Sequence, residues 1–332
     1  MCCSFKGFLI GSFVALVLSI AIGYYQIYKN ESLTQSIIEW AETNKISIKN
    51  DKIHLKTFKI EFDQNEWDLL LKKLELTRYF KPLNNAYAAR NEYGFDPEYA
   101  EELVEYWKTK FNWKSQIDYL NKYPQFKIQI NDTTIHFLRV ITNKKEDSVP
   151  IPIMLIDGWP GSFFGFYKMI EYIEREFREI SFDIVVPSIP GYGYSTPLDR
   201  PLDSTDAALL FDAIMRYLHG ENCKYNIHGE DWGSAISTSM AKLFPERVRA
   251  LHVSFPIVSL KPNPYVIWYS LLGEYWPTLF LTEHEVNHNF TFSLRNTFEI
   301  ILKKTGYFHL QATRPDTLVG YFFNFFDTKM LF

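Results

Sequence analysis

An aspartate between two glycines is the side chain of this sequence best suited to covalent chemistry. Residues 229–233 read Gly-Glu-Asp-Trp-Gly, and they separate a short apolar run at 225–227 from a stretch of helical character. Glycines at these positions allow a sharp turn from strand to helix that holds the middle side chain, Asp231, above the edge of a sheet. A carboxylate there can displace a leaving group at an sp³ carbon and form an ester, which suits an epoxide or a carbon–halogen bond. The alternative is that Asp231 only caps the helix.

Two more loops, both rich in glycine and proline, follow predicted strands. Residues 157–162 read Asp-Gly-Trp-Pro-Gly-Ser, and residues 187–195 read Pro-Ser-Ile-Pro-Gly-Tyr-Gly-Tyr-Ser. The first is the kind of loop that gives an oxyanion a second backbone N–H. Each loop alone is an ordinary turn signal. Together with the Asp231 turn they predict one crevice, because ligands bind in open α/β sheets outside the carboxyl ends of neighbouring strands.

The elements that must position these loops are short apolar runs that alternate with helical stretches. We predict strands at 151–156, 182–186, 225–227 and 248–253, and helices near 165–178, 205–219 and 234–244. Strands that are buried on both faces and separated by helices form a parallel sheet. Alternating apolar residues on either side of Asn131-Asp132 predict a hairpin, which adds an antiparallel edge.

Helical patterns flank this core on both sides. Trp67, Leu70 and Leu74 are spaced as on one face of a helix. The sequence after residue 256 is helical and aromatic, and we interpret it as a cap over the sheet. The predicted domains are a membrane anchor (1–28), a linker (29–56), a helical segment (57–125), the α/β core (126–256) and a partial helical cap (257–332).

The anchor is predicted from residues 7–25, a run without any charged residue. At a rise of about 1.5 Å per residue such a run is just long enough to cross a hydrocarbon core. Lys6 and Lys29 flank it on both sides. We therefore expect a single-pass membrane protein with membrane lipid as a partner. A cleaved secretory signal is the alternative, because Ala21 and Gly23 resemble a cleavage pair.

Charge and composition exclude several classes of protein. The 332 residues include 35 Lys and Arg against 39 Asp and Glu, a net charge of −4, so we expect no nucleic-acid partner. Three cysteines cannot build a disulfide framework. A content of 47% hydrophobic and 22% charged residues is that of a globular chain. We expect no cofactor and no bound metal.

Taken together, these motifs resemble the microsomal epoxide hydrolase family over nearly the whole chain. The matching segments are Tyr93-Gly94-Phe95, Phe111-Asn112-Trp113-Lys114, Tyr123-Pro124-Gln125-Phe126, residues 158–162, residues 187–195, Asp231-Trp232-Gly233-Ser234 and residues 306–317, Gly-Tyr-Phe-His-Leu-Gln-Ala-Thr-Arg-Pro-Asp-Thr. The resemblance implies an α/β-hydrolase fold, a mostly parallel sheet with a helical cap, after a membrane helix and a helical N-terminal segment. It also implies a location in the endoplasmic reticulum membrane, the microsomal fraction.

The resemblance implies an activity and a role for each site residue. The substrates would be water and a small lipophilic or aromatic epoxide, which is converted to a diol. Asp231 would be the nucleophile that opens the epoxide and becomes esterified, and Tyr307 would protonate the epoxide oxygen. The backbone N–H groups of Trp159 and Trp232 would form the oxyanion hole when water attacks the ester.

Two residues near the nucleophile depart from the family pattern. The family has His where this chain has Asp157, and a small Gly where it has Glu230. Both changes add negative charge close to Asp231, and like charges raise the pKa of a carboxyl group and weaken it as an anionic nucleophile. The sequence leaves open whether Glu230 points toward the crevice or away from it.

The largest departure concerns release of the ester, which requires a general base. In the family this base is a His steered by a carboxylate, on loops that follow the last two strands. The eight histidines of this chain are 54, 136, 219, 228, 252, 284, 288 and 309, and none follows a strand beyond the cap. His228 lies within a predicted strand, where we expect it to pack. We therefore expect a fold that is incomplete at its C-terminus, no general base or acid partner, and ester formation without sustained turnover.

Two other functions stay open. One is a non-catalytic relative that binds lipophilic ligands, which the extra carboxylates at Asp157 and Glu230 favour. The other is a haloalkane dehalogenase, because those enzymes also use an aspartate that is followed by tryptophan at this turn. The anchor and residues 306–317 argue against a dehalogenase.

Overall fold

A computed structural model gives the fold of the chain. The residues that it describes are 25, 35–36, 38–40, 43–44, 46–48, 53–79, 96–144, 149–255, 276–279, 282–288, 299 and 305–313. The chain divides into two compact units. Residues 46–256 and 319–332 form the first, which we call the sheet unit, and residues 1–45 and 257–318 form the second.

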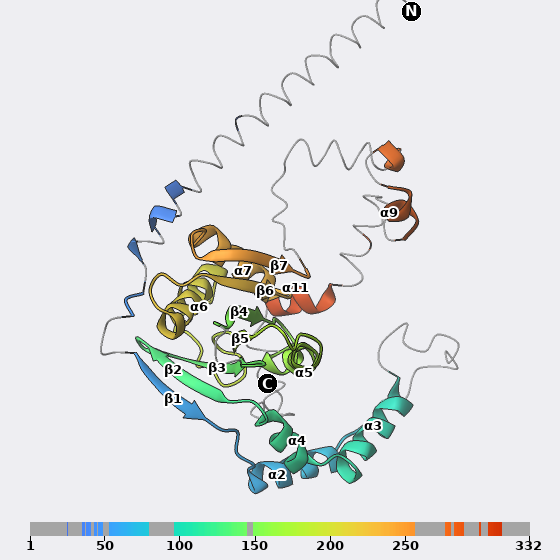
Figure 1. Cartoon of the computed structure of the whole chain (residues 1–332). Coiled ribbons are helices and arrows are strands. Elements are labelled where there is room, and N and C mark those ends of the chain that lie inside the picture. The colour runs from blue at the N-terminus through green and yellow to red at the C-terminus, as the bar shows by residue number, and fades with distance from the viewer. Residues whose placement is uncertain are drawn as a thin grey trace, which may run out of the picture. The chain divides into compact units, whose positions relative to one another are not determined.

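Seven strands form one mixed sheet in the sheet unit (Figure 1). They are β1 (His54–Phe58), β2 (Gln125–Ile130), β3 (Thr133–Ile141), β4 (Ile151–Ile156), β5 (Phe182–Pro187), β6 (Tyr225–Gly229) and β7 (Val248–Val253), in the spatial order β1-β2-β3-β5-β4-β6-β7. Strands β5, β4, β6 and β7 are parallel, whereas β1, β2 and β3 join the sheet through antiparallel pairs. The predicted α/β fold with an antiparallel edge is therefore confirmed.

Strand β1 was not predicted from the sequence. Its residues, His-Leu-Lys-Thr-Phe, are mostly exposed, and they lack the alternation of apolar and polar side chains by which a half-buried strand is recognised. The strand forms because it pairs with β2, with Thr57 opposite Phe126 and Leu55 opposite Ile128. It crosses the predicted border between linker and helical segment at residue 56.

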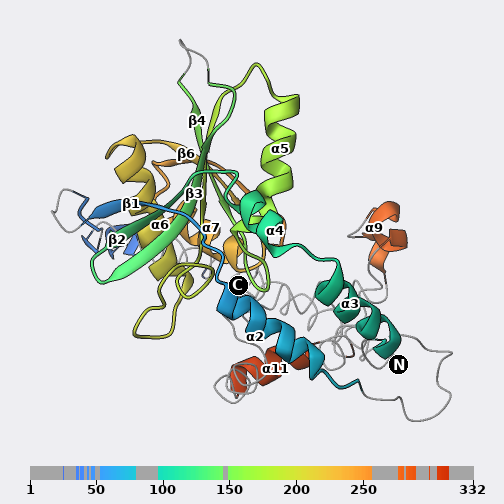
Figure 2. The ribbon, with the colours of Figure 1, turned by 90° about the horizontal axis from the view of Figure 1, so that it is seen from below.

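Helices cover both faces of the parallel strands. Helix α5 (Tyr167–Glu176), which follows a 3₁₀ turn η2 (Phe163–Phe166), lies on one side, and α6 (Ser204–His219) lies on the other (Figure 2). Helix α7 (Trp232–Leu243) packs beside α6. These helices begin and end within a few residues of the predicted ones.

The core between α5 and the sheet is built from alternate strand residues. Ile184 and Val186 of β5 belong to this cluster, whereas Val185 between them is buried on the opposite face, as the twofold repeat of a strand requires. The other members are Ile60, Tyr123, Leu138, Val140, Leu155, Phe163, Phe166, Tyr167 and Ile170. The continuous apolar runs seen in the sequence are thus strands buried on both faces.

The N-terminal helices of the sheet unit are α2 (Gln64–Glu75), α3 (Pro97–Thr109) and α4 (Trp113–Leu120). Asp63, Asp96 and Asn112 cap their first turns with side-chain oxygens. Polar contacts join this segment to the core. The Asn121 side chain bonds both backbone groups of Ile60, at 2.9 and 2.8 Å, and the hydroxyl of Tyr167 donates to Leu120 O.

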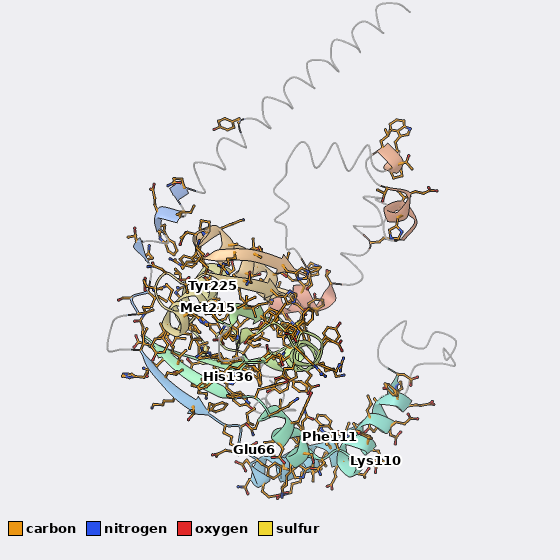
Figure 3. The ribbon with its side chains drawn as sticks, viewed as in Figure 1. Glu66, Lys110, Phe111, His136, Met215 and Tyr225 are labelled. Carbon is orange, nitrogen blue, oxygen red and sulfur yellow. The ribbon has the colours of Figure 1, made fainter. Side chains whose placement is uncertain are left out.

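A buried ion network ties α6 to β6 and β7, and the sequence did not predict it. The Asp212 carboxylate, fully buried, accepts hydrogen bonds from Arg216 Nε at 2.7 Å, Arg247 Nε at 2.9 Å and the Tyr225 hydroxyl at 2.8 Å. Arg216 also donates to Ile46 O at 2.8 Å. Tyr225 is labelled in Figure 3. The network connects residues that are far apart in the sequence, and each arginine also pairs with a second carboxylate, Arg216 with Glu221 and Arg247 with Glu246.

The described part of the second unit consists of short helical segments. They are η3 (Pro277–Leu279), α9 (Glu283–His288) and α11 (Gly306–Thr313). Their helical character agrees with the prediction for residues 257–332, most of which lie outside the described residues. The division of the whole chain into anchor, linker, helical segment, core and cap stays a prediction.

The predicted location in the endoplasmic reticulum membrane is contradicted. Among the described residues, no helix is both long and apolar enough to cross a membrane. A span needs about 20 apolar residues, whereas the longest described helix, α6, has 16 and carries charged side chains. Residues 7–24 of the predicted anchor lie outside the described residues, and the membrane-lipid partner is withdrawn with the location.

We expect Asp212→Asn to lower the free energy of unfolding by about 3–5 kcal/mol, because it removes the charge of the buried carboxylate that Arg216 and Arg247 share. Urea denaturation followed by circular dichroism measures the change. The matched control is Asp199→Asn at an exposed loop position, which should change stability by less than about 0.5 kcal/mol. Equal stability of the two variants would contradict the stabilising role of the network.

Candidate functional site

The order of the strands places the candidate site at the centre of the parallel sheet. From β4 the chain crosses to β5 on one side, and β6 lies on the other side of β4. Such a reversal of strand order opens a crevice at the carboxyl ends of the strands. The loops after β4, β5 and β6 are the three predicted from the sequence, and the pairing of β4 with both neighbours brings their ends together, as predicted.

Asp231 lies in a strained turn between β6 and α7. Its φ of 49° and ψ of −120° are rare for a residue with a side chain, and such a conformation costs about 1–3 kcal/mol. The turn is closed by glycines: a Cβ added to Gly229 would overlap Gly233 O, and one added to Gly233 would overlap Ile156 O. Asp231 makes no side-chain cap to α7, so the simple capping alternative is wrong.

The loop after β4 gives a backbone donor to Asp231. Trp159 N–H donates to Asp231 Oδ1 at 2.9 Å. Gly158 lies so close to the turn between β6 and α7 that an added Cβ would overlap the Asp231 carboxylate and stand 2.5 Å from Trp232 N. Trp232 N–H belongs to the first turn of α7, where backbone donors have no acceptor within the helix. Asp231, Trp159 and Trp232 are thus brought together, as the sequence predicts.

Asp157, at the start of the same loop, turns its carboxylate into the loop. Asp157 Oδ1 accepts from Gly158 N–H at 2.7 Å, and added Cβ atoms at Gly161 and Gly165 would collide with its oxygens. Burial raises the pKa of Asp157, and the negative charges of Glu230 and Asp231 add to the shift. The expected crowding of negative charge near the nucleophile therefore exists.

Glu230, the second departure, points to a histidine. His228 Nε2 lies 2.9 Å from Glu230 Oε1, and His228 Nδ1 lies 2.7 Å from Nδ1 of His252 on β7. His228 and His252 are direct partners in the β6–β7 register, and their rings stack. His228 is buried and packs against Phe166, as expected, but both of its ring nitrogens are also hydrogen-bonded, and one of them holds the Glu230 carboxylate.

The loop after β5 contributes Tyr192, which sequence reasoning did not single out. Tyr192 is partly buried, and its N–H donates to Ile189 O at 2.8 Å. Burial raises the pKa of Tyr192, and the negative charge of Asp231 raises it further, so this phenol lies within electrostatic reach of the candidate nucleophile. The available signal was its place between two glycines in the predicted crevice loop.

A buried histidine fixes the base of this loop to β3. His136 Nδ1 lies 2.9 Å from Ser188 Oγ, and His136 Nε2 lies 2.9 Å from Gln125 Oε1. Ser195 Oγ accepts from His136 N–H at 2.9 Å. His136 is labelled in Figure 3, and no part of it is exposed. Because it is buried, this histidine supports the loop and does not reach the crevice.

Tyr307, the predicted proton donor, lies on α11 in the second unit, and its side chain is exposed. Its role as the proton donor stays a prediction. Within the described residues, no group of three or more His, Cys, Asp or Glu side chains is arranged to hold a metal ion.

A groove of about 1300 Å³ in the sheet unit adjoins the loop after β4 but does not include Asp231. It runs along the chain after β1 and along α4, and it reaches Ser162, Phe163 and Phe164. Most of its lining side chains are apolar or aromatic. The groove is therefore separate from the crevice in which Asp231 stands.

Two known families match the chain. Residues 55–166 match the family described as epoxide hydrolase N terminus, and residues 151–298 match the alpha/beta hydrolase fold. The overlap of the two matches lies at β4 and the loop that carries Trp159. The first match covers helices α2–α4 and nearly all of strands β1–β3, and the second covers strands β4–β7.

Curated relatives and a solved structure agree with these matches. The chain is 33% identical over 308 residues to juvenile hormone epoxide hydrolase 1 of Ctenocephalides felis, covering 92% of this chain and 64% of that relative. It is 32% identical to epoxide hydrolase 1 of Sus scrofa, covering 87% of this chain and 63% of that relative. The crystal structure of juvenile hormone epoxide hydrolase from Bombyx mori superposes with a TM-score of 0.71 at 29% identity, covering 80% of this chain and 61% of that chain. The chain thus spans somewhat less than two thirds of the relatives' length.

We expect His136 to make the protein less stable as the pH falls from about 6.5 toward 3. Burial, with a smaller contribution from the positive charge of Lys127, lowers the pKa of His136 to about 3. Between pH 6.5 and 3 the unfolded chain therefore binds a proton at His136 that the folded chain does not bind. The His136 contribution is complete above pH 6.5 and declines below it, by at most about 1.4 kcal/mol per pH unit.

Urea denaturation at several pH values measures this slope. His136→Gln should flatten it between pH 6 and 4, whereas the exposed His54→Gln should leave it unchanged. The same slope in wild type and His136→Gln would contradict the assignment.

Proposed function

The chain belongs to the family of epoxide hydrolases that includes mammalian epoxide hydrolase 1 and the juvenile hormone epoxide hydrolases, and we propose that it opens lipophilic epoxides with Asp231 as the nucleophile. The single observation that carries the mechanism is the hydrogen bond from Trp159 N–H to Asp231 Oδ1, at 2.9 Å. It distinguishes the two oxygens of the carboxylate and aligns one of them with backbone donors.

The first step follows from that bond. Since Oδ1 is held by Trp159, Oδ2 is the oxygen that attacks a ring carbon of the epoxide. The new bond joins Oδ2 to carbon, the ring C–O bond breaks, and its electron pair goes to the ring oxygen, which takes up a proton. The product is an ester of Asp231 and a neighbouring hydroxyl group.

Tyr307 supplies that proton in our proposal. A phenol that donates a hydrogen bond to the ring oxygen lowers the cost of the developing alkoxide, and proton transfer of this kind is worth about 10²–10⁴-fold in rate. The proposal rests on the family motif at residues 306–317.

The second step is hydrolysis of the ester. Water attacks Cγ of Asp231, and the negative charge develops on Oδ1, the oxygen that already faces Trp159 N–H. Trp232 N–H, at the start of α7, is the second proposed donor. Removal of one such donor typically costs about 3–4 kcal/mol of transition-state stabilisation. Collapse of this intermediate releases the diol and restores the carboxylate.

The second step also requires a base, and we propose that the described residues of the sheet unit do not supply an efficient one. Among the described residues of the sheet unit, no histidine is hydrogen-bonded to Asp231. His136 is buried beneath the loop after β5, and both ring nitrogens of His228 are engaged by Glu230 and His252. We therefore propose that the ester accumulates and that sustained release of diol is slow.

The surroundings of Asp231 support a lipophilic substrate. Trp232 directly follows Asp231 in the sequence, and Trp159 donates its N–H to the Asp231 carboxylate; the two residues are 49% and 36% exposed. Large exposed aromatic side chains beside a reactive carboxylate favour aryl or alkyl epoxides over polar ones. The chemistry needs water as the second substrate and no cofactor.

A binding protein without catalysis is the second candidate, and the carboxylates around Asp231 favour it. Burial raises the pKa of Asp157, and the negative charges of Glu230 and Asp231 raise it further. Formation of a covalent ester separates the two candidates.

We expect wild-type protein incubated with an aryl epoxide to gain the mass of one epoxide molecule, and Asp231→Asn to gain none. Intact-protein mass spectrometry measures the adduct, and diol release is followed in the same samples. Glu230→Gln, at the neighbouring carboxylate, is the matched control and should still form the adduct. Absence of any adduct on the wild type would favour the binding candidate, and many turnovers of diol would contradict the missing base.

Tyr307→Phe should slow formation of the adduct by about 10²-fold, because the ring oxygen would leave without its proton donor. The rate of mass gain measures the effect, and an unchanged unfolding midpoint shows that the fold is intact. His309→Gln, on the same helix, should react like the wild type. An undiminished rate for Tyr307→Phe would remove Tyr307 from the mechanism.

A further inference from the structure

The loop after β4 is wrapped around a side chain that the mechanism above does not use. Asp157 Oδ1 accepts from Gly158 N–H at 2.7 Å, and the N–H of Ser162 also stabilises the Asp157 carboxylate. Gly161 and Gly165 pass so close that a Cβ on either would strike a carboxylate oxygen. Backbone from both ends of the loop therefore meets at one carboxylate.

The same loop carries the donor to the nucleophile. Trp159 directly follows Gly158, and its N–H points to Asp231 Oδ1 at 2.9 Å. The position of Trp159 N–H thus depends on the orientation of the Gly158 peptide, which the bond to Asp157 fixes. A displacement of about 1 Å in such a donor is enough to lose most of its contribution to a transition state.

We propose that Asp157 is a positioning residue: its carboxylate orders the loop after β4 and so aims Trp159 N–H at Asp231 Oδ1. The proposal rests on Asp231 being the nucleophile. Asp157 itself touches neither substrate nor reacting atoms, because its oxygens face the loop backbone. Its negative charge thus weakens the nucleophile, while the hydrogen bonds that it accepts organise the nucleophile's donor.

The two effects of Asp157 are separable by substitution. Asparagine keeps one acceptor oxygen for Gly158 N–H but removes the charge, and alanine removes both. The carboxylates that act electrostatically on Asp157 are Glu230, which is hydrogen-bonded to His228, and Asp231. A comparison of the two variants therefore separates the effect of the hydrogen bond from that of the charge.

The test measures the rate of adduct formation with an aryl epoxide. Asp157→Ala should form the adduct about 10²-fold more slowly than the wild type, because a Trp159 N–H displaced by about 1 Å no longer aligns the Asp231 carboxylate for attack. Asp157→Asn should stay within about fivefold of the wild type, because its side-chain oxygen still accepts from Gly158 N–H.

The matched control is Asp63→Ala, because Asp63 also accepts a backbone N–H, from Asn65 at 2.8 Å, but at the start of α2. It should lose some stability and none of the reactivity. Asp157→Ala that reacts as fast as the wild type would overturn the proposal. So would Asp157→Asn that is as slow as Asp157→Ala, or two variants that are both faster than the wild type.

A second readout does not depend on activity. In protein labelled with ¹⁵N-tryptophan, the Trp159 amide signal, assigned with Trp159→Phe, should shift when Asp231 is changed to Asn. The same change made in the Asp157→Ala background should leave the Trp159 signal in place. If the signal responds equally in both backgrounds, Asp157 does not position the donor. If the wild type forms no adduct but the signals behave as expected, the proposed function fails and the positioning stands.

Discussion

The close approach of two backbone segments is the constraint on which the rest of the site depends. The loop after β4 and the turn before α7 touch at Gly158 and Gly233, where the backbone leaves no room for a Cβ. This contact holds Asp231 at a positive φ and brings Trp159 N–H to its carboxylate. The strain in Asp231 persists because the paired ends of β4 and β6 and the packing of α7 determine the turn from both sides.

The second feature of the site is a group of neighbouring carboxylates, each of which is stabilised by a hydrogen bond. Three carboxylates, Asp157, Glu230 and Asp231, lie in two adjacent loops, and each is held by a different donor. Asp157 accepts from the backbone of its own loop, Glu230 pairs with His228, and Asp231 accepts from Trp159. Each carboxylate therefore has its own hydrogen-bond donor, and the three do not share one. In our proposal, Oδ2 of Asp231 is the oxygen that attacks the epoxide.

Sequence reasoning succeeded where a residue's environment is set by its near neighbours. The buried strands, the helices between them and the meeting of Asp231, Trp159 and Trp232 follow from apolar runs and glycine motifs. It failed where a residue's environment is set by the pairing of strands or by contacts with residues far away in the sequence. Strand β1 exists because of β2, and the bond between His228 and His252 depends on the register of β6 and β7. The network around Asp212 likewise joins residues that no local pattern connects.

The central claim is that Asp231, rather than its neighbour Glu230, forms a covalent bond with an epoxide. Trypsin cleaves after Lys224 and Lys242, so residues 225–242 form one peptide that contains both carboxylates. Fragmentation of this peptide after reaction with an aryl epoxide assigns the added mass to a single residue. We predict that the whole of it lies on Asp231. Added mass on Glu230, or an unmodified peptide, would contradict the account.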